Sequence, residues 1–187
     1  MNPVGNPVFE QREARQHDVA LWMGDEPATH PEFRRAVTLL RGGIIGAVTE
    51  VHAWTARPVW PQGGNRPEGS DPTPPELDWE LWLCGAPPRP FKQRVYHRYN
   101  WRGWYDFGGG ALGDVGCQLL SLPFRALDLG APRTVTAEEV DGATSEMYPR
   151  ASRVEARFRA PARRRPPVTL TWYEGGRRPA AGRVPAG

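Results

Sequence analysis

The sequence predicts an α+β domain with an open, mostly antiparallel sheet covered by helices on one face. Three observations lead to this prediction. Helical and strand-like segments alternate near the N-terminus, a long segment rich in proline and tryptophan follows, and a helix then precedes a run of strand-like segments. Strands gathered in this way commonly form a sheet that packs against helices on one side. At 187 residues the chain is long enough for one domain with a hydrophobic core.

The N-terminal part is expected to contain two helices and two strands. Residues 9–18 are polar and favour a helix, and the apolar run Val19–Met23 favours a short buried strand. Thr29 and Glu32 have the spacing of a capping box, which predicts the start of a second helix. Glycines end that helix after an apolar face that comprises Phe33, Ala36, Val37 and Leu40. Residues 44–56 are rich in β-branched side chains and predict a long strand.

Residues 57–110 are expected to form a long, irregular, ordered segment. They contain nine of the 21 prolines and five of the eight tryptophans. Proline cannot donate the ladder hydrogen bonds of a sheet, and tryptophan side chains favour burial. We therefore expect a packed loop with one short helix at about residues 77–83.

The C-terminal part predicts one helix and three strands. The helix covers residues 113–129, with an interruption at Pro123, and the first strand covers residues 134–140. In the second strand, 153–159, three apolar residues alternate with charged ones: Val154, Ala156 and Phe158. In the third, 168–173, three apolar residues share one face: Val168, Leu170 and Trp172. The remaining tail is rich in Gly, Pro, Arg and Ala, so we expect it to be disordered.

Composition and charge argue against several functional classes. The net charge is +3, but the 21 acidic residues are spread along the chain, so nucleic-acid binding is not expected. No apolar run approaches the roughly 20 residues needed to cross a bilayer. The two cysteines and four histidines lack disulfide or metal spacing, and the N-terminus lacks the apolar region of a secretion signal. We expect a cytoplasmic protein without a metal.

Three segments of the chain carry a family resemblance. Residues 100–114 read Asn-Trp-Arg-Gly-Trp-Tyr-Asp-Phe-Gly-Gly-Gly-Ala-Leu-Gly-Asp, and residues 41–51 and 122–130 agree with them in order. Together they resemble the Gfo/Idh/MocA family, which includes glucose–fructose oxidoreductase and inositol dehydrogenase. The resemblance implies a two-domain plan in which an N-terminal Rossmann domain binds NAD(P) and a C-terminal sheet domain binds a sugar or polyol.

On that plan, residues 1–28 are the end of a Rossmann domain and residues 29–176 are the substrate-side α/β domain, followed by a disordered tail at 177–187. The chain has no Gly-x-Gly-x-x-Gly strand–turn–helix for a pyrophosphate. Its only lysine, Lys92, is not in the family's Glu-Lys-Pro motif, and Gly24-Asp25-Glu26 stands where relatives often have Gly-Asn-Gln. The resemblance therefore implies that this chain alone binds no cofactor.

The family's helical Asp-x-x-x-His-x-x-Asp pattern matches Asp114, Gln118 and Ser121. In relatives the histidine acts as the general base for the substrate hydroxyl, whereas an amide cannot take up a proton at neutral pH. Asp114 is then either a vestige of the site or a helix cap. Four residues are candidates for binding a substrate: His97, Trp101, Arg102 and Tyr105. His97 and Tyr99 could line a sugar site, since aromatic faces stack on sugar CH groups, although packing of the loop explains these two equally well.

These observations favour a truncated or degenerate NAD(P)-dependent oxidoreductase that is inactive alone. Two alternatives stay open. One is a non-catalytic module that binds a sugar or polyol or forms a homo-oligomer through its sheet face. The other is one half of a split dehydrogenase. Unpaired strand edges and an apolar sheet face are expected to be exposed and to promote self-association.

Overall fold

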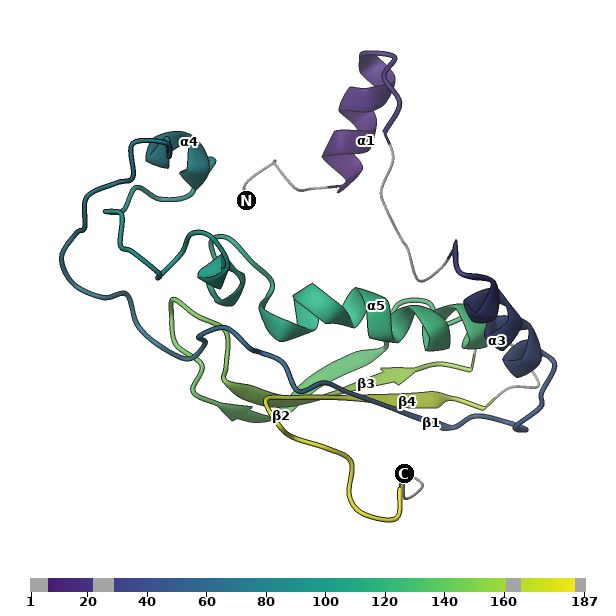
Figure 1. The fold of residues 1–187 in the computed structure, drawn as a ribbon. Coiled ribbons are helices and arrows are strands. Elements are labelled where there is room, and N and C mark those ends of the chain that lie inside the picture. The colour runs from purple at the N-terminus through teal and green to yellow at the C-terminus, as the bar shows by residue number, and fades with distance from the viewer. Residues whose placement is uncertain (1–6, 22–28, 161–165, 184–187) are drawn as a thin grey trace.

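The computed structural model describes residues 7–21, 29–160 and 166–183. The elements in these ranges are α1 (Pro7–Gln16), α3 (Pro31–Arg41), β1 (Glu50–Trp54), α4 (Trp79–Leu83), η1 (Asn100–Gly103), α5 (Gly110–Leu127), β2 (Thr134–Asp141), β3 (Ala151–Phe158) and β4 (Val168–Glu174). The strands form one sheet in the order β1-β4-β3-β2. β1 runs parallel to β4, whereas the other two pairings are antiparallel (Figure 1).

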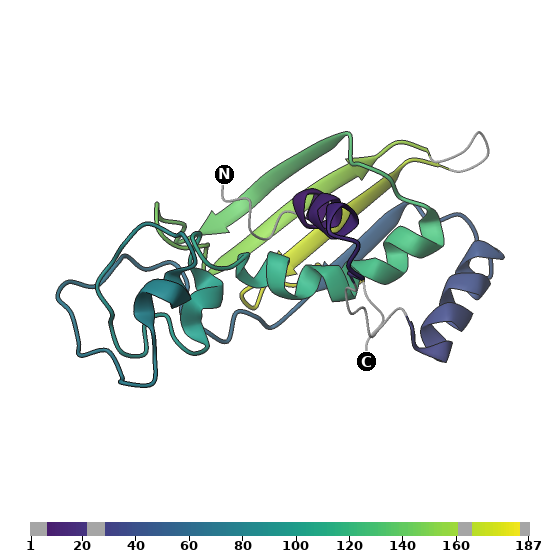
Figure 2. The ribbon, with the colours of Figure 1, turned by 90° about the horizontal axis from the view of Figure 1, so that it is seen from above.

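The helices lie on one face of the sheet, as the sequence predicts. Figure 2 shows α5 lying over the sheet with α3 beside it. Leu120 and Phe124 of α5 pack against a buried cluster that comprises Leu129, Phe158, Val168 and Leu170. Arg41 fastens the two helices together, since its Nη2 donates to the carbonyl of Arg125 at 2.7 Å. The alternation predicted for β3 and β4 is confirmed, because Phe158, Val168 and Leu170 belong to this cluster, Ala156 packs against it, and Trp172 is buried on the same face.

The opposite face of the sheet is mostly polar, so the expected apolar surface is not on that face. On the α5 side, Val135 and Val140 of the edge strand β2 are 61% and 49% exposed, which agrees with part of the expectation. Side chains alternate along a strand, and most of the residues that point to the face opposite α5 are charged or carry a hydroxyl. The residues on this face include Glu50, His52, Glu139, Arg153, Glu155, Thr169, Thr171 and Tyr173. Residues 177–183, the start of the expected tail, turn back beneath this face (Figure 1). Residues 184–187 of that tail lie outside the described ranges.

Residues 57–110 form a second, aromatic cluster, which confirms the prediction of an ordered irregular segment with one short helix. Tyr96 and Trp104 are buried, and the rings of Trp79 and Trp82 stack 4.8 Å apart beside them. Arg89 has a fully buried side chain that pairs with Asp106. Its guanidinium lies 4.7 Å from the centre of the Phe107 ring and 5.6 Å from that of Tyr96. The aromatic rings therefore replace the regular hydrogen-bonded structure that the prolines prevent.

Two N-terminal predictions are wrong. Val19 and Leu21 are 60% and 57% exposed and belong to no strand, and the last two residues of that predicted strand lie outside the described ranges. The N-cap of α3 is His30, whose Nδ1 accepts from the backbone N–H of Glu32 at 3.3 Å. Thr29 therefore does not form the expected capping box. Pro31 then occupies the first turn, where its missing N–H costs nothing.

Two further boundaries differ from the predictions. The predicted strand at 44–56 is real only at Glu50–Trp54, since Gly43 and Gly46 adopt φ values of +81° and +74° and turn the chain. Pro123 lies inside α5 without ending it. A proline withdraws only one helical donor, and α5 is held by packing along its length against the sheet and α3.

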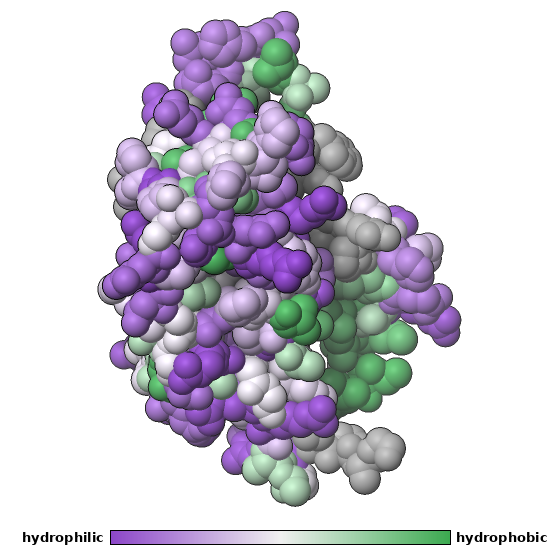
Figure 3. All heavy atoms as spheres, turned by 60° about the vertical axis from the view of Figure 1, so that its left-hand side comes forward, coloured by the Kyte–Doolittle hydropathy of each residue, from purple (hydrophilic) through white to green (hydrophobic). Residues whose placement is uncertain are grey.

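The surface in Figure 3 is largely hydrophilic, with hydrophobic residues gathered in one area at the right. In the part of the chain that the structure describes, no helix is both long and apolar enough to cross a membrane. Those same residues include no group of three or more His, Cys, Asp or Glu that could hold a metal ion.

Candidate functional site

The candidate site lies where α5 adjoins η1 and the loop that follows β1. Asp114, on the second turn of α5, receives two guanidinium groups. Arg102 Nε donates to its Oδ1 at 3.2 Å, and Arg57 Nη1 lies 3.5 Å from its Oδ2. The Asp114 carboxylate is 23% exposed. Both oxygens of one partly buried carboxylate are therefore occupied by cations.

Aromatic rings hold the two arginines in place. The Arg102 guanidinium lies 4.4 Å from the centre of the Tyr99 ring and 4.6 Å from that of Trp101. Trp60 is buried and lies against both arginines. The centre of its ring is 5.4 Å from the guanidinium carbon of Arg57 and 5.7 Å from that of Arg102. A cation over an aromatic face is attracted by the ring quadrupole. The rings therefore fix the guanidinium groups around Asp114.

Gln118 and Ser121 follow Asp114 on α5 at intervals that place all three on one side of the helix. Gln118 is exposed and its side chain makes no hydrogen bond to any described residue, whereas Ser121 is half-buried. The amide of Gln118 can accept or donate a hydrogen bond but cannot act as a base. Asp114 consequently has no proton-accepting neighbour on this side of α5.

Residues 36–128 match the family model of the oxidoreductase C-terminal alpha/beta domain of Gfo/Idh/MocA proteins. This part of the chain belongs to the Gfo/Idh/MocA family. A search of curated proteins found no match. The matched range runs from α3 through α5 and contains every candidate site residue. The sheet topology agrees with an oxidoreductase C-terminal domain of this family, as the sequence resemblance implies.

The glycine-rich stretch that leads into α5 is not a dinucleotide cradle. Gly108–Gly113 reads Gly-x-Gly-x-x-Gly, but it follows the 3-10 helix η1 and a turn in place of a strand. A Cβ on Gly108 would lie 2.4 Å from the Arg102 carbonyl oxygen, and one on Gly110 would lie 2.6 Å from Tyr148 Cγ. Protein atoms thus occupy the space that a pyrophosphate needs for close backbone approach.

The other cofactor-related residues fit NAD(P) no better. Lys92 Nζ pairs with Asp71 at 3.0 Å and helps to close the proline-rich loop. Together with the backbone N–H of Gln93, which contributes most, it holds the pKa of the Asp71 carboxyl below its usual value. Gly24-Asp25-Glu26 lies outside the described ranges. The described residues of this Gfo/Idh/MocA domain therefore do not fit the cofactor, and we derive no chemical step through it.

The structure separates the four candidate substrate-binding residues. Arg102 contacts Asp114, and the Trp101 ring lies against the Arg102 guanidinium. The Tyr105 ring instead packs 4.3 Å from that of Tyr148 and is 44% exposed, and His97 meets the edge of the Trp82 ring. Neither of these two contacts Asp114 among the described interactions.

Sequence reasoning missed two members of the site, Arg57 and Trp60, whereas Tyr99, predicted together with His97 to line a sugar site, lies against the Arg102 guanidinium. Arg57 and Trp60 lie far from Asp114 in the sequence, and no spacing links them. An arginine beside tryptophans was the available signal, since such pairs form cation–π contacts.

Proposed function

We propose that this chain is the substrate-side domain of a Gfo/Idh/MocA-type oxidoreductase whose acid–base function has been lost. On its own it binds neither NAD nor NADP and transfers no hydride. The observation that carries the proposal is the pairing of both Asp114 oxygens with Arg57 and Arg102, one helical turn from Gln118.

Oxidation of a carbinol to a carbonyl sends a hydride to NAD(P) and a proton to a base. In relatives a histidine takes that proton, and Gln118 stands at the matching position of this chain. Its amide cannot accept a proton, and each Asp114 oxygen already has a guanidinium partner. The site retains groups that suit polyol binding, namely guanidinium donors and partly exposed aromatic rings such as Tyr99, which is 43% exposed. We therefore propose that the site is a binding surface that has no group to accept the proton.

A split dehydrogenase is the second candidate, and one observation favours it. An apolar groove of about 320 Å³ lies between α3, α5 and β1, close to Gln118 in the sequence of α5. Its lining includes Leu40, Ile45, Val48, Val51, Leu119 and Leu122. Ile45 and Leu119 are 64% and 43% exposed, so a nucleotide-binding domain on a separate chain would gain free energy by covering them.

Self-association through the sheet face ranks below both candidates. The open face carries charged residues such as Arg153 and Glu155. Desolvating them in an interface would cost free energy unless each found a new partner.

The proposed function is tested by following NAD(P)H absorbance with a panel of sugars and polyols. We expect no change with the chain alone, and none when the Rossmann domain of an intact family member is added in trans. Reduction of NAD(P) by the chain alone would overturn the proposal. Turnover with the unmodified chain only when the Rossmann domain is present would establish the split dehydrogenase instead.

A further inference from the structure

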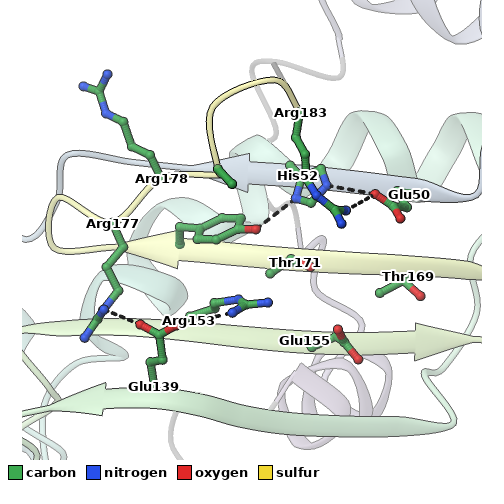
Figure 4. A pocket seen from close by; sticks show the side chains of 12 residues that line it. Glu50, His52, Glu139, Arg153, Glu155, Thr169, Thr171, Arg177, Arg178 and Arg183 are labelled. Atoms are coloured by element: carbon green, nitrogen blue, oxygen red, sulfur yellow. Dashed lines mark hydrogen bonds and ion pairs between the residues drawn. The ribbon is translucent and has the colours of Figure 1, made fainter.

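A polar pocket of about 650 Å³ lies on the opposite side of the sheet from α5. Strands β1, β2, β3 and β4 form its floor, and the C-terminal segment, residues 177–183, forms its wall (Figure 4). Arg183 Nη1 ties that segment to Glu50 Oε2 at 2.5 Å, and Arg177 ties it to Glu139. The pocket is thus a defined space of the size that small ligands occupy.

Every carboxylate that lines the pocket already has a cationic or imidazole partner. Glu50 contacts His52 Nε2 at 3.3 Å as well as Arg183. Glu139 contacts Arg177 and, at 3.3 Å, Arg153. Glu155 pairs with Arg157 at 2.6 Å. The carboxylates of the pocket therefore already have partners within the protein.

The guanidinium N–H donors of the pocket are not all paired with acceptors in the same way. A guanidinium carries five N–H groups, and these ion pairs use only some of them. The Nε atoms of Arg153 and Arg177 are buried without a hydrogen-bond partner among the described residues. Arg178, at the rim, has no ion-pair partner in the described part of the chain, and its side chain extends away from the strands in Figure 4. The unused capacity of the pocket is cationic and donating.

Hydroxyl groups on the floor add to this donor capacity. Thr169 and Thr171 of β4 line the pocket between the arginine and glutamate side chains (Figure 4). Tyr173, also on β4, has its hydroxyl 3.0 Å from His52 Nδ1. Oxygen acceptors of a ligand could therefore meet guanidinium groups from one side and hydroxyls from the other.

We propose that this pocket binds a small oxyanion, a carboxylate- or phosphate-bearing metabolite, between Arg153, Arg177 and the β4 hydroxyls, with Arg178 at the entrance. Guanidinium groups bind carboxylate and phosphate oxygens through paired N–H donors. Ion pairing of the C-terminal segment to the sheet explains why Arg177 and Arg183 lie beside Glu139 and Glu50. It leaves unexplained the enclosed space, the unpaired Nε groups and the additional cation at Arg178.

The test measures binding of inorganic phosphate and of citrate, each at constant ionic strength, by titration calorimetry. We expect at least one of them to saturate with a Kd below about 1 mM. The tighter probe distinguishes a phosphate ligand from a carboxylate ligand. The double variant Arg177→Gln, Arg178→Gln removes two donors outside the sheet and should weaken binding at least tenfold. The double variant Arg34→Gln, Arg35→Gln, which removes the same two charges from α3 on the other side of the sheet, should bind like the unmodified chain.

Nuclear magnetic resonance of the unmodified protein gives a second measurement that does not depend on the variants. The Nε–Hε signals of Arg153 and Arg177 should shift along saturable curves with the calorimetric Kd. The proposal is overturned if neither probe saturates, if the double variant binds as tightly as the unmodified chain, or if the shifts are linear and shared by arginines throughout the protein.

Discussion

Tyr148 lies directly over Gly110, so closely that a Cβ on that glycine would be 2.6 Å from Tyr148 Cγ. Gly110 also has a φ of +62°, which only glycine adopts without strain. It is the first residue of α5, the helix that carries Asp114. The contact between Tyr148 and Gly110 therefore fixes where the site helix begins.

The substitution Gly110→Ala should lower the free energy of unfolding by about 1–3 kcal/mol, because the methyl group meets Tyr148 and the backbone is strained. Gly113→Ala is the matched control. A Cβ there meets nothing within 4 Å, and alanine should stabilise the helix by up to about 1 kcal/mol. Urea denaturation of both variants measures the difference. Equal stabilities would show that Tyr148 does not pack on Gly110 in the folded protein.

The same close packing predicts that the glycine-rich stretch binds no dinucleotide. Titration of NAD or NADP into the chain should give no saturable heat with a Kd below about 100 μM. The Arg102 carbonyl and the Tyr148 ring occupy the approach to Gly108 and Gly110. Saturable binding that is lost in Gly113→Ala would mean that the Arg102 backbone and the Tyr148 ring move aside and that the stretch is a working cradle.

Periodicity predicted the sheet well where packing on one face decides the residue type. Apolar residues recur at a spacing of two, as Ala156 and Phe158 in β3 and as Val168 and Leu170 in β4, because one face of each strand meets α5. The run Ile44–Val48 led to a wrong strand prediction for the opposite reason. Ile44 is 65% exposed beside glycines that turn the chain, so its apolar character does not report a strand.

Only part of the candidate site could be predicted from the sequence. Helical spacing sufficed to place Asp114, Gln118 and Ser121 on one side of α5. The ion pair between Asp114 and Arg57 joins segments that are distant in the chain, and it depends on how residues 57–110 fold around their tryptophans. No local pattern encodes such a contact, so only the three-dimensional structure shows that the carboxylate is occupied.

The lowered pKa of the Glu50 carboxyl predicts how the C-terminal segment responds to acid. His52, chiefly by a hydrogen bond, and Arg183 hold the pKa of the Glu50 carboxyl below its ordinary value of 4.5. A lowered carboxyl pKa contributes stability that is present above about pH 4.5 and is lost as the pH falls through the lower, folded pKa. Carbon-detected magnetic resonance of the glutamate carboxyls should therefore show Glu50 titrating below 4.5.

The variant Glu50→Gln should release Arg183 and make residues 177–183 more sensitive to trypsin at neutral pH. Glu32→Gln, an exposed glutamate on α3, is the control and should leave the digestion rate unchanged. A Glu50 midpoint at or above 4.5, or digestion of Glu50→Gln at the unmodified rate, would contradict the pairing of Glu50 with Arg183.

The last prediction is that restoring a histidine at the site will not restore turnover. Gln118→His, alone or with Ser121→Asp, rebuilds the acid–base face of α5 beside Asp114. A general base contributes about 10²–10⁴-fold, but only to a reaction whose partners are already held in place. Here Arg57 and Arg102 occupy the Asp114 carboxylate, and Tyr148 and Arg102 fill the approach to the glycine-rich stretch. NAD(P)H absorbance should not change with any sugar or polyol tested.

Adding the Rossmann domain of an intact relative makes this prediction discriminating. It supplies the hydride acceptor that the glycine-rich stretch does not hold, so the introduced histidine then has a reaction to assist. If the chain is a decayed enzyme, turnover should appear only with both the added domain and Gln118→His. Gln93→His, an exposed glutamine in the proline-rich loop, is the matched control and should give none. Turnover by the unmodified chain with the added domain would show that Gln118 is not the disabling change. In that case a group other than residue 118 would be accepting the proton.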